Sequence, residues 1–382
     1  MEDISFAFFS ISRRHLTNTN IITYSDLDSL TNFDVDDNSS VGSDYSDYSA
    51  AENVEDVIDK RSKTYLHALA VKREWDAIDE FLKDPDIPDG EKKDALCYAG
   101  GDRGVNTLTV AIGSNAPCSV IQRILNVAPS TIVTSKDKYG FTPLHAVCAD
   151  ERDIEVVKLL VDRSPLEIFN AMDNDGHTSF HLAVANKANL EVVQLILNKT
   201  SPNVFRTFTR SGKSPLHLGC IFGADQSVMQ LLVDMTPLKI FSHKDDSGRS
   251  PLHSVCANEE VSQNLFPTAQ LDMFKQKQIQ GYNPFSYKPV GKRTAEIVQL
   301  LLKKTPPETY RSTGKEGYSL FALACAKAPL EVVQLIHEKT PQETFNSRDK
   351  KGSTPLRSAC ILLKVCWYPY TISTLFENRI IS

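Results

Sequence analysis

Residues 137–148 read DKYGFTPLHAVC, and parts of this stretch recur along the chain. His145 and Cys148 lie three residues apart. The same pair returns in two further copies, as His217 with Cys220 and as His253 with Cys256. Histidine and cysteine both bind zinc, and a cysteine–histidine pair can also act as a catalytic dyad. The chain therefore carries either three copies of a chemical site or one structural device that is repeated.

The repetition has a nearly constant period. Glycines at 104, 140, 176, 212 and 248 are each 36 residues apart, Gly317 follows after 69 residues, and Gly352 after 35 more. A related tetrapeptide comes after each glycine. The best copies are TPLH at 142–145 and SPLH at 214–217 and 250–253; weaker copies are TSFH at 178–181, NTLT at 106–109, SLFA at 319–322, TPLR at 354–357 and a degenerate first copy, TYLH at 64–67.

The tetrapeptide has the composition of a helix start. Thr142 is a good N-cap, Pro143 suits the first helical position, and His145 lies one turn on, where it can hydrogen-bond back toward the cap. A second motif, such as EVVQLIL at 191–197, keeps the same period and predicts a helix with one buried stripe. A proline follows each copy of the second motif and should end that helix.

This order of turn, helix, loop, helix and extended link resembles the ankyrin repeat. GFTPLHAVC and GKSPLHLGC are similar to the G-x-T-P-L-H-x-A signature of that family, over about residues 61–360. The resemblance implies an all-α solenoid of about seven to eight helix-turn-helix repeats joined by extended turn links. It also implies that the histidine bonds to the capping hydroxyl and to the neighbouring repeat's backbone. The family period is 33, so three extra residues fall after the second helix here.

The periodicity favours the structural alternative. The position of Cys148 is occupied by Cys220, Cys256, Cys325 and Cys360 in other copies, but also by Val184 and Ile112. A position that accepts cysteine, valine or isoleucine is a small core position. The histidine position likewise accepts Thr109, Ala322 and Arg357. We therefore expect no metal, no cofactor and no catalytic residue, and we assign structural roles to Thr142, His145, His181, His217 and His253.

Charge and composition limit the classes of partner and compartment. Residues 1–60 carry a net charge of −10 and the remaining residues a net of +4. This balance argues against nucleic acid as the main ligand. The N-terminus lacks the positive charge of a secretion signal, and Lys364 and Pro369 interrupt the most apolar stretch, 360–376. We expect reduced thiols in a cytoplasmic protein, with a nuclear location as the alternative, and a monomer without a membrane partner.

Three segments depart from the repeat. Residues 1–60 are predicted to be an acidic disordered tail, because they combine low hydrophobicity with high net charge. Residues 61–382 are predicted to form the repeat domain. Within it, 261–293 reads as a looped-out insert between the two helices of one repeat, and 361–382 as an atypical C-terminal cap.

The leading hypothesis is a non-catalytic protein-interaction module, a scaffold or adaptor. The family resemblance implies that an unknown protein partner meets the turn tips and the concave helix face. The tip residues are Lys138, Tyr139, Asn174, Asp175, Arg210, Asp246, Lys315, Glu316, Lys350 and Lys351. One alternative is a membrane-associated protein of this family held by the apolar C-terminal segment. A metal- or thiol-dependent enzyme is the other.

Overall fold

The computed structural model describes residues 59–101, 103–149, 153–257, 290–315, 317–355 and 357. The predicted tail (apart from residues 59 and 60), the cap at 361–382 and most of the predicted insert lie outside these residues. The chain divides after Leu159 into two compact units, and the division falls within one helix, α9. Each unit is described separately.

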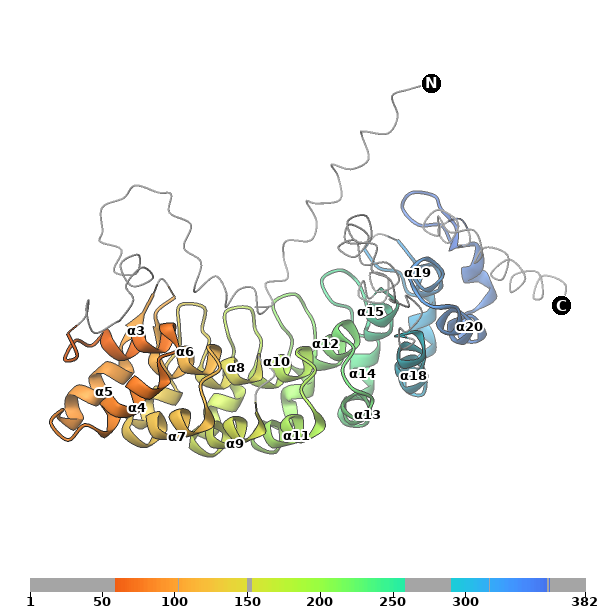
Figure 1. The fold of residues 1–382 in the computed structure, drawn as a ribbon. Coiled ribbons are helices and arrows are strands. Elements are labelled where there is room, and N and C mark those ends of the chain that lie inside the picture. The colour runs from red at the N-terminus through yellow and green to blue at the C-terminus, as the bar shows by residue number, and fades with distance from the viewer. Residues whose placement is uncertain are drawn as a thin grey trace, which may run out of the picture. The chain divides into compact units, whose positions relative to one another are not determined.

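The first unit consists of helix pairs with short connections (Figure 1). Its first helices are α3 (Tyr65–Lys72), α6 (Thr107–Gly113) and α8 (Pro143–Cys148), and its second helices are α4 (Trp75–Lys83), α7 (Cys118–Val127) and the start of α9 (Ile154–Arg163). The first helices contact one another in chain order, and α4 contacts α7. The longer link after the degenerate first copy holds α5 (Asp89–Cys97) and an antiparallel pair, β1 (Ala99–Gly100) with β2 (Val105–Asn106).

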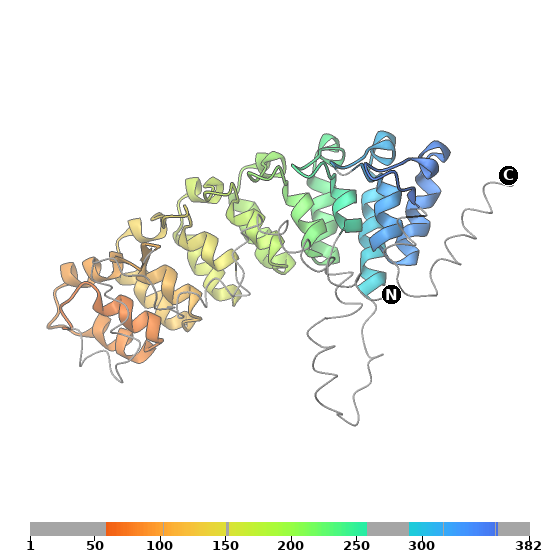
Figure 2. The same ribbon diagram turned by 90° about the horizontal axis from the view of Figure 1, so that it is seen from above.

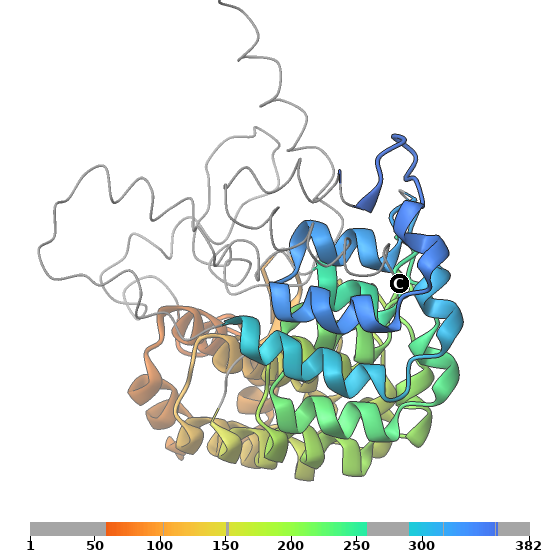
Figure 3. The same ribbon diagram turned by 90° about the vertical axis from the view of Figure 1, so that its right-hand side faces the viewer.

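The second unit repeats the same two layers (Figure 2). Its first helices are α10 (Ser179–Ala185), α12 (Pro215–Phe222), α15 (Pro251–Ala257) and α19 (Leu320–Lys327), and its second helices are α11 (Leu190–Lys199), α13 (Gln226–Met235), α18 (Val290–Leu302) and α20 (Leu330–Lys339). First helices pack on first helices and second on second. Figure 3 shows this layering from the C-terminal end. Because α18 begins at Val290, the last four residues of the predicted insert are helical.

The three extra residues per repeat form a short helical turn after each second helix. These turns are η2 (Ser130–Val133), η3 (Leu166–Asn170), η4 (Pro202–Arg206), α14 (Leu238–Phe241), η5 (Pro307–Arg311) and η6 (Gln342–Asn346). A proline stands at or just inside the start of each turn. The φ of proline is already close to the helical value, so the turn starts at little entropic cost. The prolines thus both end one helix and begin the next turn.

Each extra turn adds core and lateral contacts. In η3 and α14 the last apolar pair is buried, Ile168 with Phe169 and Ile240 with Phe241. Between neighbouring repeats of the second unit, the Ser201 backbone N–H donates to Asn170 Oδ1 at 3.0 Å. The longer period therefore supplies packing surface that a shorter link would lack.

The described residues are otherwise helix and turn, with one isolated bridge between Thr313 and Ser319. This content fits the expected all-α repeat fold. None of the helices in this part of the chain is both long and apolar enough to cross a lipid bilayer.

Candidate functional site: helix caps and hairpin tips

The histidine and the N-cap residue of the tetrapeptide form a reciprocal hydrogen-bonded pair. The His145 backbone N–H donates to Thr142 Oγ1 at 3.3 Å, and the Thr142 N–H donates to His145 Nδ1 at 3.3 Å. The Thr142 hydroxyl lies 2.7 Å from the same ring nitrogen. Two orphan donors at the helix start are thus satisfied. The arrangement recurs at Thr178 with His181 and at Ser214 with His217.

The hydrogen bonds identify the form of the imidazole. Because Nδ1 accepts a hydrogen bond from the backbone N–H of the cap residue, the ring is neutral and carries its proton on Nε2. In His217 this second nitrogen lies 3.3 Å from the carbonyl oxygen of Arg249, in the next repeat. His217 therefore joins its own helix cap to the neighbouring hairpin.

Copies without histidine use other polar side chains for the same purpose. Asn106 caps α6 by accepting from the Thr109 N–H at 2.8 Å, and its amide nitrogen donates to the Ile132 carbonyl at 3.0 Å. Ser319 caps α19 by accepting from the Ala322 N–H. In these copies the N-cap side chain satisfies the helix start without a histidine, and Thr109 or Ala322 stands at the histidine position.

The extended links form hairpins that precede each first helix. In the hairpin tip at Asp137, the carboxylate oxygen Oδ1 accepts from the N–H groups of Tyr139 and Phe141, and Asp245 holds Ser247 and Arg249 in the same way. Such Asx turns fix the backbone of the tip from within.

Adjacent tips are joined by backbone hydrogen bonds within each unit. In the first unit, Lys138 N–H donates to the Arg103 carbonyl at 2.9 Å. In the second unit, Arg210, Asp246 and Lys315 donate to the carbonyls of Asp175, Ser211 and Ser247. The glycine at each tip makes this approach possible, because it has a positive φ and lacks a Cβ.

The comparison with protein families agrees with this geometry. A family model described as "Ankyrin repeats (3 copies)" matches residues 108–207 and, in an overlapping match, 180–275. The chain is an ankyrin-repeat protein. No curated protein matches the chain. The caps and tips of the matched region are therefore those of ankyrin repeats.

The ankyrin hairpins display the predicted contact residues at their tips. Nine of the ten are exposed: Lys138, Tyr139, Asn174, Asp175, Arg210, Asp246, Lys315, Lys350 and Lys351. The tenth, Glu316, lies outside the described residues. The tips thus form a row of accessible polar side chains within each unit, whereas the first helices are largely enclosed; every residue of α10 and of α15 is buried.

Tyr139 lies in a cluster that includes one residue missed by the sequence analysis. The Arg103 guanidinium lies 5.0 Å from the centroid of the Tyr139 ring and bonds to Asp137 Oδ2 at 2.7 Å. The Lys138 ammonium lies 5.8 Å from the same centroid. Arg103 precedes Gly104 as Tyr139 precedes Gly140, so aligning the glycines would have placed it at a tip.

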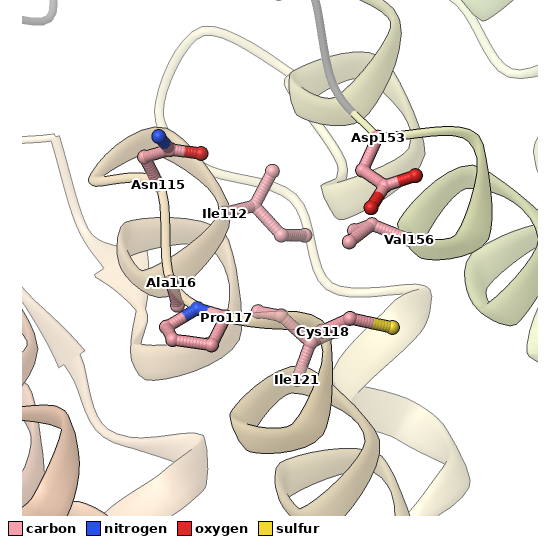
Figure 4. A pocket seen from close by; sticks show the side chains of 8 residues that line it. All are labelled: Ile112, Asn115, Ala116, Pro117, Cys118, Ile121, Asp153 and Val156. Atoms are coloured by element: carbon pink, nitrogen blue, oxygen red, sulfur yellow. The ribbon is translucent and has the colours of Figure 1, made fainter.

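A cavity of about 260 Å³ in the first unit is separate from the tips (Figure 4). It lies between the α6–α7 connection and the start of α9, and Asn115, Cys118 and Asp153 are on its wall. Burial, Asp153 and Glu155 raise the pKa of Cys118. This environment disfavours the thiolate, which is the reactive form of the cysteine side chain. Across the described residues, no three His, Cys, Asp or Glu side chains are grouped for a metal ion.

The repeated cysteines should react slowly with a thiol reagent in the native protein. Cys148, Cys220 and Cys256 are buried, and burial raises the pKa of each thiol, to about 12 for Cys256. Peptide-level mass spectrometry after brief labelling should find these three unmodified while the exposed Cys97 is labelled. Labelling of all three as fast as Cys97 would contradict the core assignment.

Stability should fall as the pH drops below about 6.5. Burial lowers the pKa of His217 to about 3 and the pKa values of His67 and His253 to about 4, from 6.5. Between those limits the unfolded chain binds more protons, so acid favours unfolding by about 1.4 kcal/mol per pH unit for each histidine. Denaturant titrations at pH 7.5, 6 and 5 should show this loss. A constant free energy of unfolding down to pH 5 would refute the buried neutral imidazoles.

Proposed function

We propose that this ankyrin-repeat protein is a non-catalytic interaction module that binds a protein partner through its hairpin tips. Ankyrin repeats generally mediate protein–protein interaction. In this chain, the exposed residues at the hairpin tips support the same role. Because the first helices are largely buried, we place the main contact with the partner at the hairpin tips and not on the helix face. A scaffold or adaptor in the cytoplasm is the role that fits such a module.

Tyr139 is the best single contact residue. Its ring is 46% exposed, yet Arg103 and Lys138 hold it in place. A large aromatic side chain that is already ordered loses little entropy on binding, and tyrosines are enriched among residues that dominate interface energies. Lys138 would also favour an anionic group of the partner next to the ring, whereas Arg103 already pairs with Asp137.

The chemistry of the repeats supports a module without catalysis. The thiols at the repeated position are buried with raised pKa values, and the histidines are used as neutral caps. A thiol-dependent enzyme needs an accessible thiolate beside a base. No described residue favours the enzymatic alternative. The segment invoked for membrane attachment, 360–376, lies outside the described residues.

Tyr139→Ala should weaken partner binding while leaving the fold nearly intact. We expect a stability loss of about 0.5–1 kcal/mol from the exposed cation–π contacts. Loss of a hot-spot residue should weaken binding by about thirtyfold. The partner is first captured on the full chain and identified by mass spectrometry, and its affinity is then measured by titration calorimetry.

The matched control is Leu166→Ala, which removes a side chain that is 64% exposed at the start of η3, away from the tips. This control should keep the affinity of the unsubstituted chain. If Tyr139→Ala binds as tightly as the control, the partner uses another surface, and the tip proposal is wrong.

A further inference from the structure

The hairpins of the second unit together carry an excess of positive charge, although the one at 172–177 contains two Asp and no Lys or Arg. Four of them, at 208–213, 244–249, 313–318 and 348–353, contain eight Lys or Arg and four Asp or Glu. We call these four segments the basic hairpin surface. Two of its acidic residues, Asp245 and Asp349, are buried and accept N–H groups of their own turns. The acidic groups that remain are too few to balance the cations.

The cations of this surface bond to neutral oxygens instead of carboxylates. Lys244 Nζ donates to the Thr313 carbonyl at 2.8 Å, and Lys213 Nζ donates to Ser211 Oγ at 2.9 Å. Within the described part of the chain, none of the eight Lys and Arg residues forms a salt bridge. Such a surface attracts an anionic polypeptide.

Lys213 is half-buried beside charged side chains of the next hairpin. Burial lowers the pKa of this lysine, the nearby Asp245 and Asp246 offset part of the effect, and Arg249 adds to it.

The same chain contains a segment of complementary charge. Residues 15–58 include ten Asp or Glu and no Lys or Arg. An extended chain spans about 3.3–3.6 Å per residue, so residues 15–58 can reach about 150 Å. A free nucleic acid or acidic protein would be repelled by this segment, whereas the segment itself is always present.

We propose that the acidic segment at residues 15–58 binds the basic hairpin surface of the second unit. The segment occupies tips that the proposed function assigns to the protein partner, including Arg210, Lys315 and Lys350, so it competes with that partner. This regulatory consequence rests on the proposed function, whereas binding of the segment does not. Salt weakens the contact, because the charges are exposed and screened over about 10 Å at 0.1 M ionic strength.

The test uses the full chain and a fluorescent peptide of residues 26–56. In one variant, the ten acidic residues of the segment are replaced by Asn or Gln, so that the surface is vacant at unchanged length. Fluorescence anisotropy at 50 mM salt should show the peptide binding to this variant and about tenfold more weakly to the unsubstituted chain, whose own segment competes. Equal affinity for both chains would overturn the proposal.

Substitutions in the basic hairpin surface test where the peptide binds. Lys315→Gln, Lys350→Gln and Lys351→Gln, added to the neutralised chain, remove three exposed charges and should weaken peptide binding about tenfold in total, since each exposed pair contributes little. The matched control replaces three other exposed lysines of the same unit, Lys199, Lys239 and Lys339. Its affinity should stay within about twofold of the neutralised chain, because screening limits distant charges.

Three outcomes overturn the assignment. They are no binding of the peptide, an equal loss in both triple variants, and binding of a ten-nucleotide polyuridylate in place of the peptide. None of these readouts involves the external partner. A failure here therefore leaves the tip contact proposed for that partner intact, and a failure of the Tyr139→Ala experiment leaves this one intact.

Discussion

Gly248→Ala should destabilise the second unit by about 4 kcal/mol, which places it among the exceptional single substitutions. Two effects add at this position. Gly248 has a φ of +73°, a region that costs an L-residue about 1–2 kcal/mol. In addition, a Cβ would lie 2.7 Å from the backbone nitrogen of Lys315 and 3.2 Å from the backbone of Gly314. Backbone atoms cannot rotate out of the way as a side chain can. The hydrogen bond from the Lys315 N–H to the Ser247 carbonyl would therefore have to break.

Two other glycines separate the conformational cost from the steric one. Gly352 has a φ of +75° but open space around its missing Cβ, and Gly90 lies in α5 with open space and no positive φ. Gly352→Ala should cost about 1 kcal/mol. Gly90→Ala should be neutral or stabilising by up to about 1 kcal/mol. Urea unfolding of the three variants should give this order; equal effects at Gly248 and Gly352 would show that close approach of the hairpins contributes nothing.

The sequence predicted those features of the repeat that depend only on neighbouring residues. The period of the glycines, the capping role of Thr142 and the helix ends before proline follow from backbone preferences that a few neighbouring residues determine. The resemblance to ankyrin repeats then implied how successive helix pairs stack. The structure shows the same helix pairs, with α5 and the β1–β2 pair in the longer first link.

Features that depend on distant residues could not be predicted. The 36-residue spacing shows that Gly248 recurs, but only the fold brings the backbone of Lys315 against it. Aligning the glycines gives the tip position of Arg103 but not its contact with Tyr139, which joins two hairpins that are far apart in sequence. The sequence also did not decide the conformation of the link after each second helix, because proline can start a turn as readily as it ends a helix.

His217→Ala should cost about 3 kcal/mol of folding free energy. The substitution removes the bonds from Nδ1 to Ser214 and from Nε2 to Arg249, each worth about 1 kcal/mol, and leaves a cavity at a side chain with no exposed surface. Leu238→Ala is the control, because this residue of α14 in the same unit is 64% exposed and caps no helix. Its free energy of unfolding should stay within about 0.5 kcal/mol of the unsubstituted chain.

Amide hydrogen exchange of the His217→Ala variant tests the structural role of the repeated histidine most directly. In a linear array, stability is the sum of repeat and nearest-neighbour terms, so a lost cap should weaken only the adjoining interfaces. Protection should fall in α12 and in the helices that pack on it, α10, α13 and α15, and should stay unchanged in α20. Unchanged protection throughout, together with the loss of a biochemical activity, would contradict the account and make the histidine a chemical group.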